Sequence, residues 1–264
     1  MVSDFYVAPK YKIMACGIRK SMSQLTTNAM CLLNDEQSFI EGSHNFNETW
    51  NSKRSCTFTQ HFRVPSEELL SDPDTVRFAF IRDPFERFVS FYLDKCLKEN
   101  RCWNCGKDMA CILKRVYQRL KNFQNRREWK SIPGYTEMHA SPLSWNCDFN
   151  ENISKWHFLM MGVDAEERKS SILQLANILR RRGVPDKIVK RVREETLESE
   201  TDHATHKSPQ RREAERRIRE DVVVRDYLHK IYFFDYLVFP FSREHLDAKY
   251  QTDFWELPAK KNSK

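Results

Sequence analysis

Glycine is scarce in this sequence, with 6 glycines among 264 residues. Many nucleotide-binding folds hold phosphate in a loop of closely spaced glycines, because glycine lets backbone N–H groups approach the phosphate oxygens. No segment has that glycine pattern, which counts against an ordinary glycine-rich nucleotide fold. The same absence argues against an ATPase.

Long apolar segments are also missing. No run of apolar residues approaches the roughly 20 residues that a helix needs to span a bilayer. The first residues, Met1 to Lys10, lack the apolar core of a secretory signal peptide. The sequence therefore indicates neither a membrane-spanning helix nor a signal peptide.

Length and charge limit the class of protein. A chain of 264 residues can bury a large core, and we expect a single α/β domain over residues 1–264. The net charge is +7, from 44 Lys and Arg against 37 Asp and Glu, and this excess suits a polyanionic partner. Nucleic acid and an acidic glycan both meet that description, and charge does not separate them.

Eight cysteines are present, and four of them, Cys96, Cys102, Cys105 and Cys111, fall in one charged stretch. Cys102 and Cys105 have the spacing of a zinc-binding pair, but the other spacings do not repeat it. Disulfides formed in an oxidising compartment are the favoured interpretation, with a zinc site as the alternative. Two glycosylation sequons, starting at positions 47 and 152, fit that compartment.

The segment from Val76 to Lys95 has the pattern of a strand, a tight turn and a helix. Phe78 to Ile81 is an uncharged apolar run, which is typical of a buried strand. Asp83 is a favoured N-cap residue and Pro84 suits the first helical position, so a helix is predicted to start here.

Such a turn creates a pocket for an anion. It places Arg82 at the carboxyl end of a strand, beside the free N–H groups of a helix, with Arg87 and Ser90 on the non-apolar face of that helix. An ordinary connection whose arginines form ion pairs explains the same spacing equally well.

A second unit of this kind lies near the amino terminus. Tyr11 to Ala15 predicts a strand, and apolar residues recur at helical spacing from Met22 to Leu33. Between them, Lys20 and the hydroxyls of Ser21 and Ser23 supply groups that hold a phosphate at a helix start. A solvated helix cap is the alternative for Lys20 and Ser21 taken alone.

The rest of the chain alternates between polar loops and periodic apolar segments. The sequence predicts a surface loop from Asn34 to Arg54 and a strand within Lys155 to Val163. Helices are predicted at Ser66–Leu70, at Cys111–Phe123, around Ile172–Leu179 and from Gln210. The helix at Cys111–Phe123 has a basic face, which is either a solvated surface or one wall of a groove for an acidic chain.

The run Arg82-Asp83-Pro84-Phe85-Glu86-Arg87-Phe88-Val89-Ser90-Phe91-Tyr92 resembles the 3′-phosphate-binding motif of Golgi carbohydrate sulfotransferases. The similarity is to the branch that includes the chondroitin sulfotransferases. In that family the first Arg and the Ser hold the 3′-phosphate of the donor, 3′-phosphoadenosine 5′-phosphosulfate. The resemblance assigns these roles to Arg82 and Ser90, and we include Arg87 in the donor site.

The loop Arg19-Lys20-Ser21-Met22-Ser23 is similar to the family's 5′-phosphosulfate-binding loop, in which Cys-x-x-Pro-Lys precedes a helix. Arg19 replaces the usual proline, while Lys20 is retained. The resemblance implies that residues 19–23 hold the 5′-phosphosulfate and that Lys20 stabilises the leaving oxygen.

Two further segments extend the resemblance to nearly the whole chain. His139-Ala140-Ser141-Pro142, with Cys147 downstream, is similar to the family's His-Trp-x-Pro segment, and His139 is the first candidate for a catalytic base. His61 lies in a region from which sulfotransferases commonly supply a basic residue, and it is the second candidate. Tyr232 to Phe239 looks like the family's terminal Tyr-x-x-Asp motif.

The resemblance implies a three-layer, P-loop-like α/β fold with a central parallel sheet flanked by helices. It implies a carbohydrate O-sulfotransferase of the Golgi lumen that moves a sulfuryl group from the donor to a hydroxyl of an acidic, chondroitin-like or other proteoglycan or glycoprotein chain. No metal ion is required, and nucleic acid is not the expected partner. Because the family is usually anchored by an N-terminal membrane helix, either this chain begins after its anchor or the protein departs from that topology.

Two other functions remain open. One is a catalytically silent protein that binds acidic glycans on the same fold. The other is a nucleoside-phosphate kinase, against which the absence of a glycine-rich pattern in residues 19–23 argues.

Overall fold

A four-stranded sheet with the order β1-β2-β3-β4 forms the centre of the computed structural model. The structure describes residues 4–49, 54–59, 62–125, 134–162, 164–198 and 208–252. The strands are β1 (Phe5–Ala8), β2 (Ile13–Cys16), β3 (Val76–Ile81) and β4 (Trp156–Met160). The predicted strands in β2, β3 and β4 are confirmed to within a few residues, whereas β1 was not predicted.

The direction of β1 differs from the expected all-parallel sheet. Strands β2, β3 and β4 are parallel, but β1 pairs with β2 in the antiparallel direction. Only a short turn, Pro9–Tyr11, connects the two, and Lys12 follows it in the left-handed conformation. A connection this short can only reverse the chain, since parallel neighbours need a long crossover.

The parallel strands place both predicted anion loops at one edge of the sheet. Cys16, the last residue of β2, pairs in register with Ala79 of β3. Residues 17–22 follow the last residue of β2, and Arg82 follows the last residue of β3. Both loops therefore begin at the carboxyl ends of neighbouring parallel strands. This arrangement confirms the expected α/β architecture, in which ligands bind at the carboxyl ends of the strands.

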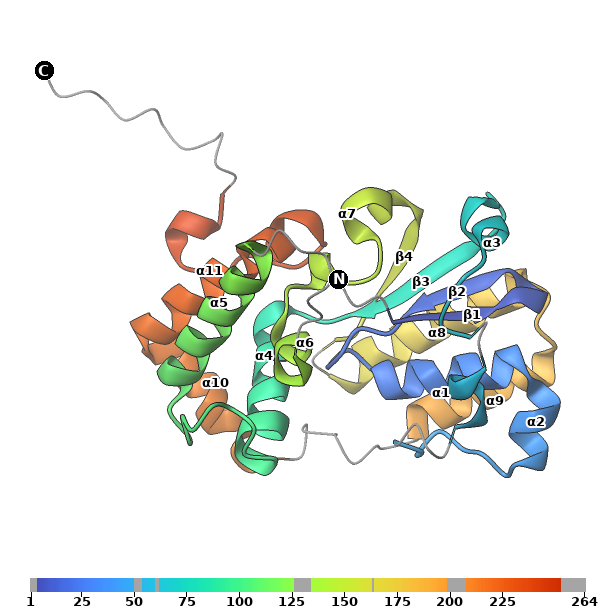
Figure 1. The fold of residues 1–264 in the computed structure, drawn as a ribbon, viewed down its shortest axis with the longest axis horizontal. Coiled ribbons are helices and arrows are strands. Elements are labelled where there is room, and N and C mark those ends of the chain that lie inside the picture. Colours follow the sequence, from blue (N-terminus) through green and yellow to red (C-terminus); the bar gives the residue numbers. More distant parts are fainter. Residues whose placement is uncertain are drawn as a thin grey trace, which may run out of the picture.

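Helices cover both faces of the sheet (Figure 1). Those before β4 are α1 (Ser23–Asn34), α2 (Glu36–Glu41), α3 (Glu67–Ser71), α4 (Pro84–Phe91), α5 (Met109–Asn125), α6 (Tyr135–Ala140) and α7 (Phe149–Asn152). Those after β4 are α8 (Ala165–Arg181), α9 (Asp186–Glu198), α10 (Arg211–Glu220) and α11 (Val222–Val238). The predicted helices at Ser66, Cys111, Ile172 and Gln210 are thereby confirmed.

Alternating side chains of β3 enter two separate cores. Phe78 and Phe80 pack with residues of α1, α8 and α9 on one face, while Ala79 and Ile81 pack with residues of α4, α5 and α11 on the other. Both sets are almost completely buried, which explains why the strand is an unbroken apolar run. The result is the expected arrangement of helices, sheet and helices in three layers.

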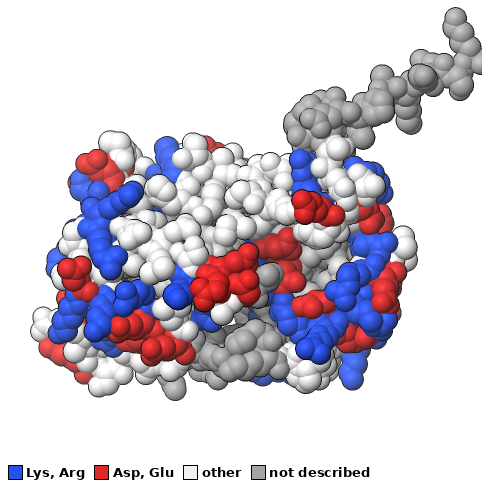
Figure 2. Space-filling model, turned by 180° about the vertical axis from the view of Figure 1, so that it is seen from behind, with Lys and Arg blue, Asp and Glu red and all other residues white. Residues whose placement is uncertain are grey.

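Basic and acidic side chains are interspersed on the face opposite to that of Figure 1 (Figure 2). They form mixed groups toward the two ends of this face, while an acidic group lies near its middle, below an area poor in charged residues. On α10, for example, Arg216 lies 2.9 Å from Glu213 and also pairs with Glu220. Such exposed pairs contribute little to stability because solvent screens them, so the mixed charges chiefly keep the surface polar.

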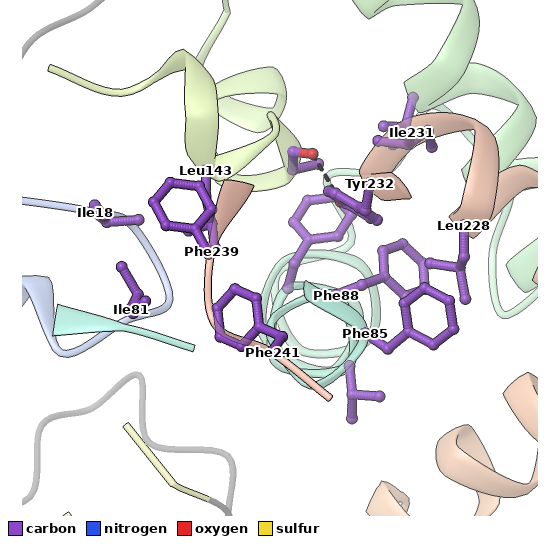
Figure 3. Packing of buried hydrophobic residues seen from close by; sticks show 14 of the residues in the cluster. Ile18, Ile81, Phe85, Phe88, Leu143, Leu228, Ile231, Tyr232, Phe239 and Phe241 are labelled. Atoms are coloured by element: carbon purple, nitrogen blue, oxygen red, sulfur yellow. Dashed lines mark hydrogen bonds between the residues drawn. The ribbon is translucent and has the colours of Figure 1, made fainter. Parts of the chain in front are cut away.

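The core beside α4 is rich in aromatic residues (Figure 3). Phe85 and Phe88 of α4 pack against Tyr232 and Leu228 of α11, while Ile18 from the first anion loop lies next to Leu143 at the edge of the same cluster. Burial of each large side chain stabilises the fold by about 1.5–3 kcal/mol. The helix that begins at the second anion loop is therefore held rigidly.

The segment Asn34–Arg54, predicted to be a surface loop, is partly structured and partly buried. It contains α2, and the ring of Phe46 is completely buried. The side-chain amide of Asn28 donates to the carbonyl oxygens of Phe46 and Glu48, at 2.9 and 3.0 Å. The prediction was wrong because these contacts join polar loop atoms to the helix α1, which no local pattern reveals.

All eight cysteines lie within the described residues, and all are paired. The disulfides are Cys16–Cys147, Cys31–Cys56, Cys96–Cys102 and Cys105–Cys111. Disulfide formation was the favoured prediction and is confirmed. Cys102 and Cys105 bond to different partners and are not available as a pair of zinc-binding thiolates. Within the described ranges, no helix is both long and apolar enough to cross a membrane.

Candidate functional site

The turn between β3 and α4 forms as the sequence predicts. Asp83 is the N-cap of α4, and its Oδ1 accepts hydrogen bonds from the backbone N–H groups of Phe85 and Glu86, at 2.9 and 3.0 Å. Pro84 occupies the first helical position. The other carboxylate oxygen of Asp83 accepts a hydrogen bond of 2.8 Å from the hydroxyl of Tyr236 in α11. The cap thus fixes the start of α4 and ties it to the last helix.

Arg82 lies at this turn with its side chain only 9% exposed. Burial lowers the pKa of Arg82 to about 10, and the charge of nearby Arg211 acts in the same direction against the opposing effect of Glu86. The guanidinium remains a cation at neutral pH. Its Nη2 lies 3.5 Å from Oε2 of Glu86, and Ser90 is buried one further turn along α4.

Arg87 lies in the interior, not on the open polar face that the sequence suggested. Its guanidinium donates from Nε to the carbonyl of Arg19, at 2.9 Å, and from Nη1 to the carbonyl of Ser141, at 2.6 Å. Burial lowers the pKa of Arg87. In this position Arg87 joins the amino-terminal anion loop to the segment that follows His139.

The amino-terminal loop has an unusual backbone for residues other than glycine. Lys20 and Met22 have φ values of 67° and 57°, in the left-handed region. Each such residue costs about 1–3 kcal/mol, a strain that is concentrated at functional sites in many proteins. The hydroxyl of Ser21 is buried and has no hydrogen-bond partner among the described residues. Arg19 forms an ion pair of 3.1 Å with Asp4, and Ser23 is the first residue of α1.

The ammonium of Lys20 is buried against a carboxylate. Its side chain is 5% exposed, and Nζ donates a hydrogen bond to Asp94, which is 1% exposed. Burial lowers the pKa of Lys20 from 10.5 to about 8, although the charge of Asp94 opposes this shift. Lys20 therefore stays mostly protonated at neutral pH but is far easier to deprotonate than an exposed lysine.

Asp94 reaches Lys20 from a π-helical segment, Tyr92–Lys98, that continues α4. Lys95, the next residue, is also buried and lies 2.9 Å from the carboxylate of Asp94, with Glu99 as its second partner. Within this π-helical segment the consecutive charged side chains of Asp94 and Lys95 are both buried, and π-helical turns are frequent at functional sites. The network thus connects α4 to the amino-terminal loop.

His139 lies close enough to this network to be affected by it. Burial, followed by the positive charges of Lys20 and Arg19, holds the pKa of His139 well below 6.5. The imidazole is therefore neutral at pH 7. Its Nδ1 donates to the carbonyl of Tyr135, at 2.6 Å, which places the proton on that nitrogen and leaves Nε2 as an acceptor.

Long-range bonds hold the His139 segment in place. The Cys16–Cys147 disulfide joins the end of β2 to it. The hydroxyl of Tyr232 donates to the carbonyl of Ala140, at 2.7 Å (Figure 3). The carboxylate of Asp235 accepts from two backbone N–H groups, at 2.7 and 3.0 Å. The terminal Tyr-x-x-Asp-Tyr motif thus positions both His139 and, through Tyr236, the start of α4.

The predicted site residues fall into two groups. The structure gathers around the first loop Arg19, Lys20, Ser21, Met22, Ser23 and His139. Arg82 lies at the turn before α4 and Ser90 on that helix, and Arg87 joins the first loop to the His139 segment. His61 lies outside the described residues. Asp94 and Arg211 were not predicted. Asp94 directly precedes Lys95 in a pattern typical of an exposed helix, and Arg211 is one of many arginines in α10.

The fold and site define an α/β protein with two cationic loops at one sheet edge. Residues 3–242 match the sulfotransferase family, and the chain belongs to that family. Carbohydrate sulfotransferase chst-1 of Caenorhabditis elegans is 32% identical over 257 residues, which are 93% of this chain and 77% of that protein. A second protein of that nematode, vep-2, is named as a candidate sulfotransferase and is 30% identical over 217 residues, 77% of this chain and 65% of that protein. No solved structure matches the chain.

Proposed function

We propose that this protein is a carbohydrate sulfotransferase, folded as one catalytic domain, that uses 3′-phosphoadenosine 5′-phosphosulfate as donor. Membership of the sulfotransferase family and the similarity to chst-1 support this function. The observation that carries it is the juxtaposition of a buried lysine, Lys20, with a neutral histidine, His139, at the loop that follows β2. Lys20 can stabilise the negative charge of the leaving group, and His139 can accept the proton of the attacking hydroxyl.

The first loop suits the 5′-phosphosulfate. The N-terminal turn of α1 has no side-chain cap, so the N–H groups at Ser23 and the next residues can bind an anion. The unpartnered hydroxyl of Ser21 lies beside them, and Lys20 adds a charge. Arg19 and Met22 would complete the contacts through the backbone.

The second loop suits the 3′-phosphate. Arg82 is a buried cation whose Nε has no partner among the described residues, and Ser90 is buried one helical turn beyond Glu86, which lies 3.5 Å from Arg82. A guanidinium of this kind binds two phosphate oxygens at once. Arg87 would act indirectly, by holding the first loop and the His139 segment together.

The chemistry follows from these positions. The acceptor hydroxyl forms a new S–O bond while the bond between sulfur and the bridging oxygen of the nucleotide breaks, and negative charge collects on that oxygen. Lys20 stabilises the charge, and Nε2 of His139 takes the hydroxyl proton. By analogy with phosphoryl transfer, positioning and charge stabilisation supply most of the rate. His61 remains a second candidate for the base.

We further propose an acidic glycan acceptor, chondroitin-like or on another proteoglycan or glycoprotein, and a site of action in the Golgi lumen in association with the membrane. Chst-1 is named as a carbohydrate sulfotransferase, which supports a glycan as the acceptor. Four disulfides support an oxidising compartment. A catalytically silent glycan-binding protein is the second candidate function. Arg19 stands where the family's first loop usually has proline, and the ammonium of Lys20 already donates a hydrogen bond to Asp94.

Titration calorimetry of the oxidised protein with 3′-phosphoadenosine 5′-phosphate tests the donor site, with adenosine 5′-phosphate as the ligand that lacks the 3′-phosphate. We expect binding that depends on the 3′-phosphate and is lost in Arg82→Ala. Lys20→Ala and Arg82→Ala should abolish transfer of labelled sulfate to a panel of glycans, while the exposed Lys187→Ala retains it. Specific nucleotide binding without transfer to any glycan would favour the silent protein, and no binding would overturn the donor assignment.

A further inference from the structure

Arg211, the first residue of α10, reaches the Arg82 site from a distant part of the chain. Its guanidinium donates to Oε2 of Glu86, 125 residues earlier in the sequence. The same carboxylate oxygen lies 3.5 Å from Nη2 of Arg82. Arg82 from the turn before α4 and Arg211 from α10 therefore meet at one atom of the motif that we assign to the 3′-phosphate.

Both guanidiniums retain unused donors in this buried position. Nε of Arg82 and Nη1 of Arg211 are buried, and neither has a hydrogen-bond partner among the residues that the structure describes. The Arg82 side chain is 9% exposed and the Arg211 side chain 17%. Buried donors without partners are rare and destabilising, so one on each of two guanidiniums that share a carboxylate oxygen indicates a place for an additional acceptor.

The carboxylates at this point do not satisfy the arginines. Asp83 uses its oxygens to cap α4 and to accept from Tyr236. Glu86 is shared between the two guanidiniums, and Glu215 lies 2.7 Å from Arg211 as its second partner. A phosphate dianion supplies several acceptor oxygens and two charges, and it matches a pair of guanidiniums better than one shared carboxylate does.

We propose that Arg211 is a second 3′-phosphate-binding residue, which acts together with Arg82 and gives the site its selectivity for a 3′-phosphorylated nucleotide. Glu86 keeps the two arginines close together against their mutual repulsion when no nucleotide is bound. This inference rests on the proposed function of the same site. The competing explanation is that Arg211 only fastens α10 to α4 through its ion pair.

The test compares Arg211→Gln with Arg212→Gln, an exposed neighbour on the same helix whose replacement removes the same charge. Calorimetry measures the Kd for 3′-phosphoadenosine 5′-phosphate and for adenosine 5′-phosphate. Loss of a charge-assisted contact should weaken binding of the first ligand by about 10- to 100-fold in Arg211→Gln. The Kd for adenosine 5′-phosphate should change by less than about threefold, and Arg212→Gln should bind both ligands like the wild type.

Equal effects on both ligands would show a merely structural role and overturn the proposal, as would an unchanged Kd for both. If Arg211→Gln does not fold, Arg211→Lys is the second variant. It keeps the positive charge and the pair with Glu86 but cannot bind a phosphate in the bidentate geometry of a guanidinium. It should still lose affinity only for the 3′-phosphorylated ligand. Failure of the proposed function is distinguishable, because the wild type itself would then not discriminate between the two nucleotides.

Discussion

Replacement of Asp94 by asparagine should shift the pH dependence of donor-site binding. Asp94 is the partner of Lys20, whose pKa is about 8 because burial outweighs the favourable carboxylate. Above that pH the lysine loses its charge. The affinity for 3′-phosphoadenosine 5′-phosphate should therefore be constant near pH 7 and fall above about pH 8, whereas an exposed lysine would remain charged to about pH 10.

The size of the effect follows from the ion pair. At pH 7 a lysine with a pKa of about 8 is about nine-tenths protonated. An opposite charge in contact raises the pKa of such a group by about 1–3 units, so Asp94→Asn should lower the pKa of Lys20 to about 5–7. The protonated fraction at pH 7 then falls to about one-half or less. The fall in affinity should begin at a pH lower by about 1–3 units.

Calorimetric titrations between pH 5 and 9.5 cover both the fall near pH 8 expected of the wild type and the earlier fall expected of Asp94→Asn. Lys20→Gln is the control and should bind weakly without the step near pH 8. If Asp94 merely competes with the donor for Lys20, Asp94→Asn will instead bind more tightly at pH 7, with the fall still near pH 8. That result would refute the view that Asp94 maintains the charge of Lys20.

Two further changes test the base and the framework. His139→Gln should abolish sulfuryl transfer, because His139 acts on the acceptor hydroxyl. The Kd for the nucleotide should stay within about twofold of the wild-type value. Normal turnover in this variant would eliminate His139 as the base. Removing the Cys16–Cys147 disulfide, which closes a sequence separation of 131 residues, should cost about 5 kcal/mol of unfolding free energy in urea titrations. Removing Cys105–Cys111, with a separation of 6, should cost only about 2 kcal/mol, and equal costs would contradict the chain-entropy explanation.

The sequence by itself determined the local units of the fold. The apolar run of β3, the cap at Asp83 and the proline at the first helical position are adjacent in the chain, so their physical effects can be recognised without the tertiary structure. The same is true of α5 and α8, where apolar residues recur at helical spacing. Motifs at Arg82, Lys20 and His139 were also recognisable, because each is a short contiguous segment.

Only the tertiary structure decided what these residues contact. Lys20 meets Asp94 across 74 positions of sequence, and Arg211 meets Glu86 across 125. Arg87, expected on a polar face, is buried, and two backbone carbonyls from separate segments accept hydrogen bonds from its Nε and Nη1. Burial and partner geometry set both the pKa of Lys20 and the pairing of the two arginines. These quantities depend on distances through space, which the order of residues along the chain does not contain.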